Sequence, residues 1–461
     1  MTRIALKRRV FGIETEYGVT CASTDGSGAN PLDADQAARL LFAPLMEKGR
    51  SSNLFLPNGG RLYLDVGSHP EYATAECDRL EDLLAQEQAG DSLLADLITQ
   101  ANAKLKTDGI AGTLHVFKNN LDSQGNSFGC HENYLMRRDK DFRSKVDSLV
   151  SFFVTRQILT GAGWVRHDDD GITYCLSQRA HLTDDAVSSA TTRSRPIVNT
   201  RDEPHADADV YRRLHVIVGD TNVSQSATLL KVGATDMLLS CVEAGISFDD
   251  FALDNPMEAI RQITEDTSGT TKVLMADGSY KSALDIQEGI LAWVEESLDP
   301  ESLSAMHHKV LSLWKEGLLA LRRDNQEELA RNFDWAAKLV LLRRYMQRTG
   351  ATLADPRVAR LCLAYHDITG SGLRLAERGL LATQVDSSEV LRATEVPPAT
   401  TRAHLRGRVV KTAEDNRRDV TVDWVHIRLL DGTLPTVLLH DPFLTQSPEV
   451  EAVIAEIEKH G

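Results

Sequence analysis

The sequence predicts an α+β fold with a small C-terminal α+β domain, on three observations. Short segments that alternate between apolar and polar residues, typical of half-buried strands, recur up to about residue 218. Helical spacing then dominates most of residues 222–380. The segment EVPPATTR, Glu395 to Arg402, is the best candidate for a linker, and strand-like and helix-like segments follow it. We therefore expect two domains, 1–398 and 399–461.

Residues 8–19, RRVFGIETEYGV, form the first predicted strand. Its aromatic and aliphatic residues occupy one face, whereas Glu14 and Glu16 share the other face. The two carboxylates are then about 7 Å apart, which suits two divalent cations bridged by nucleotide phosphates. An exposed strand face can also carry two glutamates without any ligand, so both interpretations stay open.

Helices are predicted on both sides of a second strand. Residues 33–47 have helical spacing, with Asp33 as the N-cap, and residues 80–105 suggest helices interrupted near Gly90 that cover the back of the sheet.

The second predicted strand, Arg61 to Val66, also has a polar face. Arg61, Tyr63 and Asp65 share it, and Glu71 and Thr74 follow within ten residues. This concentrates an arginine, carboxylates, a phenol and a hydroxyl in one short segment. A solvated edge strand with ordinary surface ion pairs is the alternative.

Further short strands are predicted at 113–118, 131–136 and 211–218. His131, at the start of one strand, fits a hydrogen-bonded core histidine better than a metal ligand. Arg213 and His215 share one face of the last strand, where His215 could be a metal ligand or a satisfied half-buried side chain.

A polar stretch, Ser177 to Asp209, is predicted to be a structured loop that crosses a site. It contains Arg193, Arg195 and Arg201, and two more arginines follow, so we expect a local anion site for phosphate or carboxylate. Ion pairs with the acidic residues of the same stretch are the alternative.

The C-terminal segment contains a predicted strand at 420–430 and a predicted helix at 448–460. Trp424 and His426 share one face of that strand and could stack on a nucleotide base, although an isolated tryptophan is usually a core residue.

Length, charge and cysteine spacing restrict the class of protein. The 461 residues allow a sizeable core, and a net charge of −16 argues against non-specific nucleic-acid binding. The six cysteines lack metal-ligand spacing, so reduced thiols are expected.

The opening residues lack the apolar run of a signal peptide, and no run of about 18 apolar residues occurs, so we expect a cytoplasmic protein without a membrane segment. No GxxxxGK[ST] motif is present, which excludes a P-loop.

Several motifs together resemble one known family. The strings GIETEYGV, RLYLDVGSHPEYATAEC, FKNN, GCHENYL, SSATTRSRPI, NTRDEPHADADVYRRLHVIVGD and TVDWVH closely resemble the Pup-ligase family, also called proteasome accessory factor A. The family looks like a branch of the carboxylate–amine ligases related to glutamine synthetase. The resemblance implies a large antiparallel sheet that forms a concave cradle over helices. It also implies ATP-dependent attachment of the C-terminal glutamate of Pup, a small disordered acidic modifier, to lysines of proteins destined for a bacterial proteasome.

The resemblance also implies roles for individual residues. The family's magnesium ligands fall on Glu14, Tyr63 and Glu71, with Glu16 as an additional ligand. Its ATP contacts fall on Arg61, Thr74 and Trp424, and its catalytic base falls on Asp65. Two further assignments, His215 as a metal ligand and Arg213 as a contact to nucleotide or to a Pup carboxylate, rest on the placement of these residues alone.

The expected reaction explains why these groups are needed. Because a carboxylate does not react with an amine in water, ATP would first convert the glutamate γ-carboxylate of Pup to an acyl phosphate, with Mg²⁺ neutralising charge. Three alternatives remain: the paralogous depupylase, a small-molecule carboxylate–amine ligase, and a Pup-binding adaptor without activity. The short interval between Gly18 and Arg61 argues against the depupylase, which carries an extra loop there.

Overall fold

The computed structural model describes residues 3–26, 28–49, 51–65, 67–122, 125–168, 171–189, 195–369 and 375–459. Within them, eight strands form one sheet in the order β10-β11-β12-β7-β1-β5-β4-β3. Each neighbouring pair is antiparallel except β10 and β11, which are parallel. The predicted α+β class and the large, mainly antiparallel sheet are confirmed.

The strands of the large sheet come from distant parts of the chain. They are β1 (Phe11–Glu16), β3 (Asn53–Phe55), β4 (Arg61–Leu64), β5 (Pro70–Ala73), β7 (Cys130–Arg137), β10 (Asp185–Ser188), β11 (Pro196–Asn199) and β12 (Tyr211–Val216). The smaller sheets pair β2 (Gly18–Ser23) with β6 (Gly112–Phe117), β8 (Trp164–Asp168) with β9 (Gly171–Cys175), and β13 (Lys272–Leu274) with β14 (Tyr280–Ser282). A three-stranded sheet near the C-terminus contains β15 (Val420–Val422), β16 (His426–Leu429) and β17 (Val437–Leu438).

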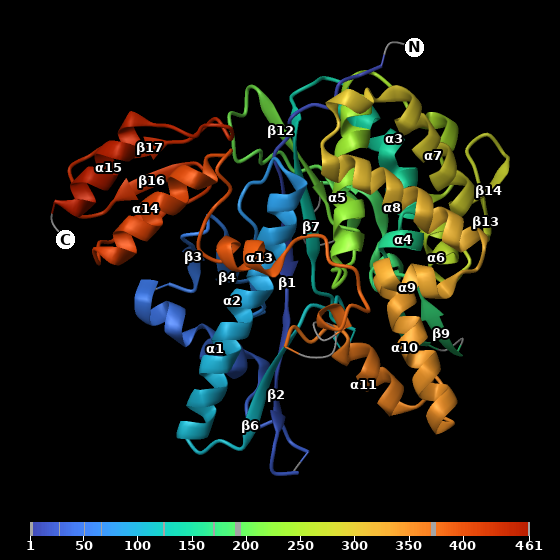
Figure 1. Cartoon of the computed structure of the whole chain (residues 1–461), viewed down its shortest axis with the longest axis horizontal. Coiled ribbons are helices and arrows are strands. Elements are labelled where there is room, and N and C mark those ends of the chain that lie inside the picture. The colour runs from blue at the N-terminus through green and yellow to red at the C-terminus, as the bar shows by residue number, and fades with distance from the viewer. Residues whose placement is uncertain are drawn as a thin grey trace.

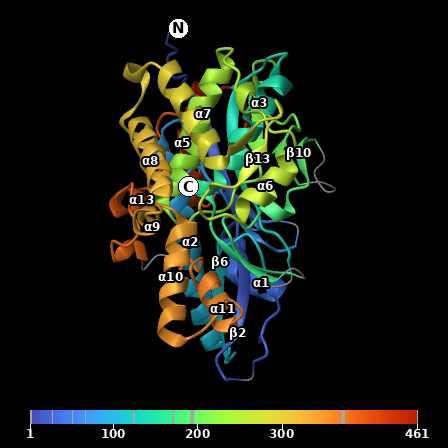
Figure 2. The ribbon, with the colours of Figure 1, turned by 90° about the vertical axis from the view of Figure 1, so that its right-hand side faces the viewer.

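Helices pack on one side of the large sheet and beside its end. The first half of the chain contains α1 (Ala34–Gly49), α2 (Leu80–Thr107), α3 (Phe142–Thr155), α4 (Gln157–Thr160) and α5 (Gln225–Glu243). The second half contains α6 (Pro256–Thr264), α7 (Ala283–Ser297), α8 (Ala305–Arg322), α9 (Gln326–Asn332), α10 (Asp334–Thr349), α11 (Pro356–Ala364), α13 (Ser387–Ala393), α14 (Ala403–Asp415) and α15 (Pro448–Glu458). Helices α3, α5, α7 and α8 pack against one another as a layer (Figures 1 and 2).

The alternation of β1 decides which face of the sheet meets this layer. Phe11, Ile13 and Thr15 are buried, whereas Glu14 and Glu16 are half-buried on the opposite face. The main core joins Phe11 and Ile13 to apolar residues of β7, β12, α3 and α5. The predicted division of this strand into an apolar and an acidic face is therefore confirmed, although the predicted single strand 8–19 is two strands, β1 and β2, separated at Tyr17.

Helix α1 begins where the sequence predicts. The Asp33 carboxylate accepts the backbone N–H of Gln36 at 2.8 Å, and the Gln36 side chain accepts the N–H of Asp33 at 3.0 Å. The prediction of Asp33 as N-cap is confirmed.

The predicted interruption near Gly90 is wrong, because α2 runs unbroken from Leu80 to Thr107. A Cβ atom at Gly90 would lie 2.3 Å from a ring carbon of Tyr72. Glycine is present there because it lets the helix pack closely on the Tyr72 ring, rather than because the helix ends.

Two other predicted elements are corrected by the structure. The stretch Ser177–Asp209 is not one loop: it contains β10 and β11, which form the edge of the large sheet. The predicted strand 420–430 is a hairpin of β15 and β16, because Asp423 accepts the backbone N–H groups of Val425 and His426 and turns the chain. Trp424 therefore lies in a turn and does not share a strand face with His426.

The C-terminal elements form a core of their own. Leu405 and Val409 of α14 pack with residues of β16, β17 and α15, and these elements lie together at one end of the molecule (Figure 1). The predicted linker is firmly held at its end, since Thr401 and Arg402 are buried and hydrogen-bond to Glu76. Within the described ranges, no helix is long and apolar enough to cross a membrane.

Candidate active site

Polar side chains from several strands lie together on the face of the large sheet that is opposite the main core, because the strands pair in a fixed register. Glu14 is paired with Ala73 and with His131, and Glu16 is paired with Glu71, which is paired in turn with Tyr63. Because directly paired residues point to the same side of an antiparallel sheet, these groups share one face. Arg61 on β4 and Arg213 and His215 on β12 lie on this face by the same register.

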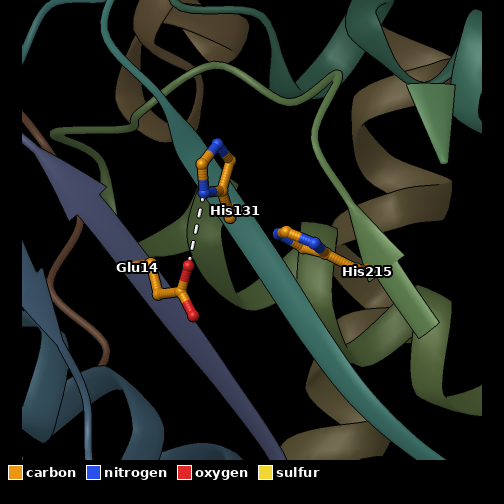
Figure 3. Close-up of side chains that lie close together, drawn as sticks. All are labelled: Glu14, His131 and His215. Carbon is orange, nitrogen blue, oxygen red and sulfur yellow. Dashed lines mark hydrogen bonds and ion pairs between the residues drawn. The ribbon is translucent and has the colours of Figure 1, made fainter. Parts of the chain in front are cut away.

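Glu14, His131 and His215 form the first group that could hold a metal ion (Figure 3). The Nδ1 atom of His131 is 3.3 Å from a Glu14 oxygen, and Asn133 donates to the other oxygen at 3.1 Å. The rings of His131 and His215 stand edge to face with their centres 5.1 Å apart. The Nε2 atom of His215 is buried and has no hydrogen-bond partner in the protein, which leaves it available to a cation or a water molecule.

Burial and neighbouring charges determine the protonation states of Glu14 and His215. Burial opposes ionisation of Glu14, but the hydrogen bond with His131, the charge of His131 and the charge of Arg213 hold the pKa of the carboxyl below its usual range. Burial, together with the charge of His131, lowers the pKa of His215 to about 3. His215 is therefore a neutral imidazole at pH 7, the form that can bind a cation.

Glu16, Glu71 and His131 form a second, adjoining group. Glu71 is buried, and burial together with the negative charge of Glu14 raises its pKa to about 8. Burial and the charges of Glu14 and Glu71 also raise the pKa of Tyr63, whose phenol hydrogen-bonds to Glu71. Crowded carboxylates of this kind are stabilised when a cation lies between them.

A pocket opens beside the first group. Glu14, Thr74, Arg213 and Trp424, four of the predicted site residues, line it. Thr74 accepts the backbone N–H of Ile13 at 3.1 Å, which joins β1 to the chain just beyond β5. Trp424 contacts the ring of Phe55 edge-on, with centroids 4.9 Å apart.

Arg61 and Asp65 lie outside the lining of this pocket. The Arg61 guanidinium lies 4.1 Å from the centre of the Tyr63 ring and donates to Asn53 at 2.8 Å. Asp65 follows the end of β4 in an exposed turn, where its carbonyl accepts the N–H of Ser68. Val66, the last residue of that predicted strand, lies outside the described residues.

The predicted arginine cluster is only partly assembled. Arg213 is half-buried, donates to Asn133 at 3.1 Å and is 3.5 Å from Glu203. Arg201 is exposed and forms an ion pair with Glu203, which agrees with the alternative prediction of local ion pairs. Arg212 points away from this face and lies over the ring of Phe142, and Arg193 falls outside the described residues.

Sequence reasoning missed His131, which belongs to both groups of potential metal ligands. The available signal was weak: the polar–apolar alternation of CHENYL puts His131 and Asn133 on one face, but only the pairing of β7 with β1 brings them to Glu14. Glu76 and His205 also line the pocket and lie within the quoted motif strings, but no pattern distinguished either of them, or Arg402, as a site residue.

Comparison with known proteins gives one consistent result. The family model described as Pup-ligase protein matches residues 9–428. The Pup–protein ligase of Sanguibacter keddieii is 51% identical over 451 residues, which are 97% of this chain and 99% of that protein.

Two solved structures agree with this match. A crystal structure of the complex between the prokaryotic ubiquitin-like protein Pup and its ligase PafA superposes with a TM-score of 0.92 at 42% identity, covering 99% of this chain and 92% of that one. A structure of the Pup ligase PafA in complex with ADP has a TM-score of 0.82 at 41% identity, covering 93% of this chain and 95% of that one. The chain belongs to the Pup-ligase family.

Proposed function

We propose that this protein is an ATP-dependent Pup ligase that joins the C-terminal glutamate of Pup to lysine ε-amines of target proteins and so marks them for proteasomal degradation. One observation beside the family membership carries the proposal. Glu14 both lines the pocket and belongs to the first group of potential metal ligands. A nucleotide in the pocket can therefore direct its phosphates to the acidic face of the sheet, where a carboxylate would be activated.

Divalent cations fit the polar face. Glu14, Glu16 and Glu71 supply the carboxylate oxygens that Mg²⁺ prefers, and Tyr63 and His215 complete the proposed ligand set. The orphaned Nε2 atom of His215 and the raised pKa of Glu71 support this assignment, and His131 adjoins both groups. Bound Mg²⁺ would neutralise phosphate charge during phosphoryl transfer.

The nucleotide contacts are proposed for Arg61, Thr74, Trp424 and Arg213. Both Trp424 and Thr74 line the pocket, where Trp424 offers a ring to an adenine and Thr74 offers a hydroxyl. Arg213, which is half-buried beside Glu14, can form charge-assisted bonds with a γ-phosphate or with the Pup carboxylate. Arg61 lies two strands from Glu14 on the same face, in reach of the phosphate end of the same site.

Asp65 is the proposed base for the acceptor lysine. A free lysine has a pKa near 10.4, so deprotonation at pH 7 costs about 4.6 kcal/mol before attack. The exposed position of Asp65, next to the strand that carries Tyr63, lets a target protein present its lysine there. The carboxylate can orient the ammonium and accept its proton as the amine attacks the activated carbonyl.

The domain boundary and the cellular location are also proposals. The separate core of the C-terminal elements supports a small domain over 399–461 beside a catalytic domain over 1–398, with Trp424 as its contribution to nucleotide binding. The six unpaired, buried cysteines are consistent with a cytoplasmic protein.

The test is a reconstituted reaction. Purified protein is mixed with glutamate-ended Pup, ATP, Mg²⁺ and a lysine-bearing acceptor, and conjugate mass and ADP release are measured. We expect a conjugate heavier than the acceptor by the mass of Pup less one water, formed with one ADP and only when ATP is present. Release of Pup from a preformed conjugate, without any ligation, would instead favour the depupylase.

A further inference from the structure

A buried ionic cluster lies at the wall of the nucleotide pocket and has no part in the proposed chemistry. The Glu76 carboxylate accepts hydrogen bonds from Arg402 at 2.9 Å and from Arg406 at 3.0 Å. The side chains of Glu76, Arg402 and Arg406 are 9%, 3% and 0% exposed. Burial disfavours ionisation of Glu76, but the two guanidinium groups outweigh it and lower the pKa of the carboxyl to about 2, so all three groups are charged.

The cluster joins separate parts of the chain. Glu76 lies three residues beyond β5, the strand that carries Glu71, and both Glu76 and Arg402 line the pocket. Arg402 directly precedes α14, and Arg406 lies within it. One carboxylate thus binds the C-terminal elements to the end of the strand that carries the proposed metal ligand.

Arg402 also holds one wall of the pocket. Its Nη2 atom donates to the carbonyl of His205, and its Nη1 atom donates to the carbonyl of Leu439 at 2.6 Å. His205 lines the pocket and has φ +49°, in the left-handed region that non-glycine residues rarely occupy. The bond from Arg402 helps to hold this uncommon backbone conformation.

Arg406 holds the adjoining part of the pocket lining, at Trp424, whose ring centre is 6.3 Å from that of His205. It donates to the carbonyl of Trp424 at 3.3 Å and to the carbonyl of Gly59 at 2.9 Å. Its guanidinium carbon lies 5.0 Å from the centre of the Trp424 ring and 5.0 Å from that of Phe55. The orientation of the Trp424 ring, proposed above to contact the base, is therefore set by a buried cation on α14.

We propose that Glu76, Arg402 and Arg406 are positioning residues that fix the His205 and Trp424 walls of the pocket in the conformation that binds nucleotide. The inference rests on the proposed function, because it requires that ATP occupy this pocket. The physical gain is preorganisation: walls already held in place lose less conformational freedom when the nucleotide binds. Phosphoryl transfer takes place at the other groups, so the cluster acts on nucleotide affinity and leaves the chemical step unaffected.

Two conservative variants test the two walls separately. Arg402→Lys and Arg406→Lys keep the positive charge beside Glu76 but lose the planar fork that reaches two acceptors at once. We expect the Kd for ADP, measured by calorimetry, and the KM for ATP to rise at least tenfold in each variant. At saturating ATP, kcat should stay within threefold of the wild type, and the KM for Pup should not change.

Glu87→Gln is the matched control. Glu87 is likewise a buried carboxylate, 2.6 Å from the buried ammonium of Lys118, but it does not line the pocket. A role confined to folding would lower the thermal midpoint in all three variants without raising the KM for ATP. An ADP Kd within twofold of the wild type in both lysine variants would overturn the proposal.

A measurement on the wild type covers the case in which the variants fail to fold. The amides of Asp207, Arg402 and Leu439, which donate to the backbone carbonyls of His440, Pro442 and Val425, should exchange hydrogen slowly without nucleotide, and ADP should change their rates little. Rapid exchange that becomes slow only with ADP would contradict preorganised walls. A wild-type protein that binds no ADP would overturn the proposed function itself, whereas tight wild-type binding with unaffected lysine variants would overturn only this inference.

Discussion

Replacing Glu14 by glutamine should slow Pup ligation by about a hundred- to a thousandfold, as expected when several kcal/mol of charge stabilisation are lost. The Glu14 carboxylate is the only side chain that joins the first group of potential metal ligands to the pocket lining, within the ranges that the structure describes. Glutamine keeps the shape and can still hydrogen-bond His131 and Asn133, but it lacks the negative charge that holds a cation. Initial rates of conjugate formation, measured over a range of Mg²⁺ concentrations, check this.

The Mg²⁺ dependence distinguishes a cation role from a structural one. The Mg²⁺ concentration for half-maximal rate should rise at least tenfold in Glu14→Gln, and excess Mg²⁺ should restore part of the activity. Glu87→Gln, which changes a buried carboxylate of the Lys118 cluster, should keep the wild-type Mg²⁺ dependence. If Glu14→Gln kept more than a third of the wild-type rate with an unchanged Mg²⁺ dependence, Glu14 would not be a metal ligand.

Replacing Asp65 by asparagine should reduce lysine ligation at pH 7 by about 10²- to 10⁴-fold, the usual contribution of a general base. Asparagine cannot accept the proton of the acceptor ammonium. The deficit should shrink as the pH rises, because the neutral fraction of a free lysine increases about tenfold per pH unit below 10.4. Conjugate formation between pH 7 and pH 9.5, with wild type and variant side by side, measures this convergence.

A nucleophile that is already neutral distinguishes a role of Asp65 in proton transfer from a role in carboxylate activation. Hydroxylamine needs no deprotonation at pH 7, so both proteins should form the Pup hydroxamate at similar rates in the presence of ATP. An equal loss of hydroxamate and of lysine conjugate in Asp65→Asn would place Asp65 in carboxylate activation rather than in proton transfer.

Local patterns predicted the acidic strand but not its neighbours in the sheet. The i, i+2 spacing of Glu14 and Glu16 determines their shared face, because side chains alternate along any strand. The position of His131 opposite Glu14 depends on the pairing of β1 with β7, which are far apart in the sequence. Many pairings would satisfy the same alternation, so a histidine at the start of a strand could not be assigned to the site.

The other differences between the predicted and the observed structure arise from contacts with residues that are distant in the sequence. Gly90 was predicted to interrupt a helix, since glycine is a poor helix former, but the Tyr72 ring that requires it lies on β5. Trp424 fitted the alternation of a strand, yet the Asp423 side chain turns the backbone there. The pocket walls at His205 and Trp424 are held by arginines of another segment, which no local pattern could indicate.

In the proposed mechanism, ATP activates the side-chain carboxylate of the Pup glutamate as an acyl phosphate before the amine attacks. The most direct measurement uses Pup whose terminal glutamate carries ¹⁸O in its side-chain carboxylate, followed by mass analysis of the phosphate released during conjugation. Attack on the acyl carbon expels phosphate together with the bridging oxygen, so we expect one ¹⁸O atom in each phosphate formed per conjugate. Conjugate formation with unlabelled phosphate would rule out this mechanism, because the carboxylate would then never have been bonded to the phosphorus that leaves as phosphate.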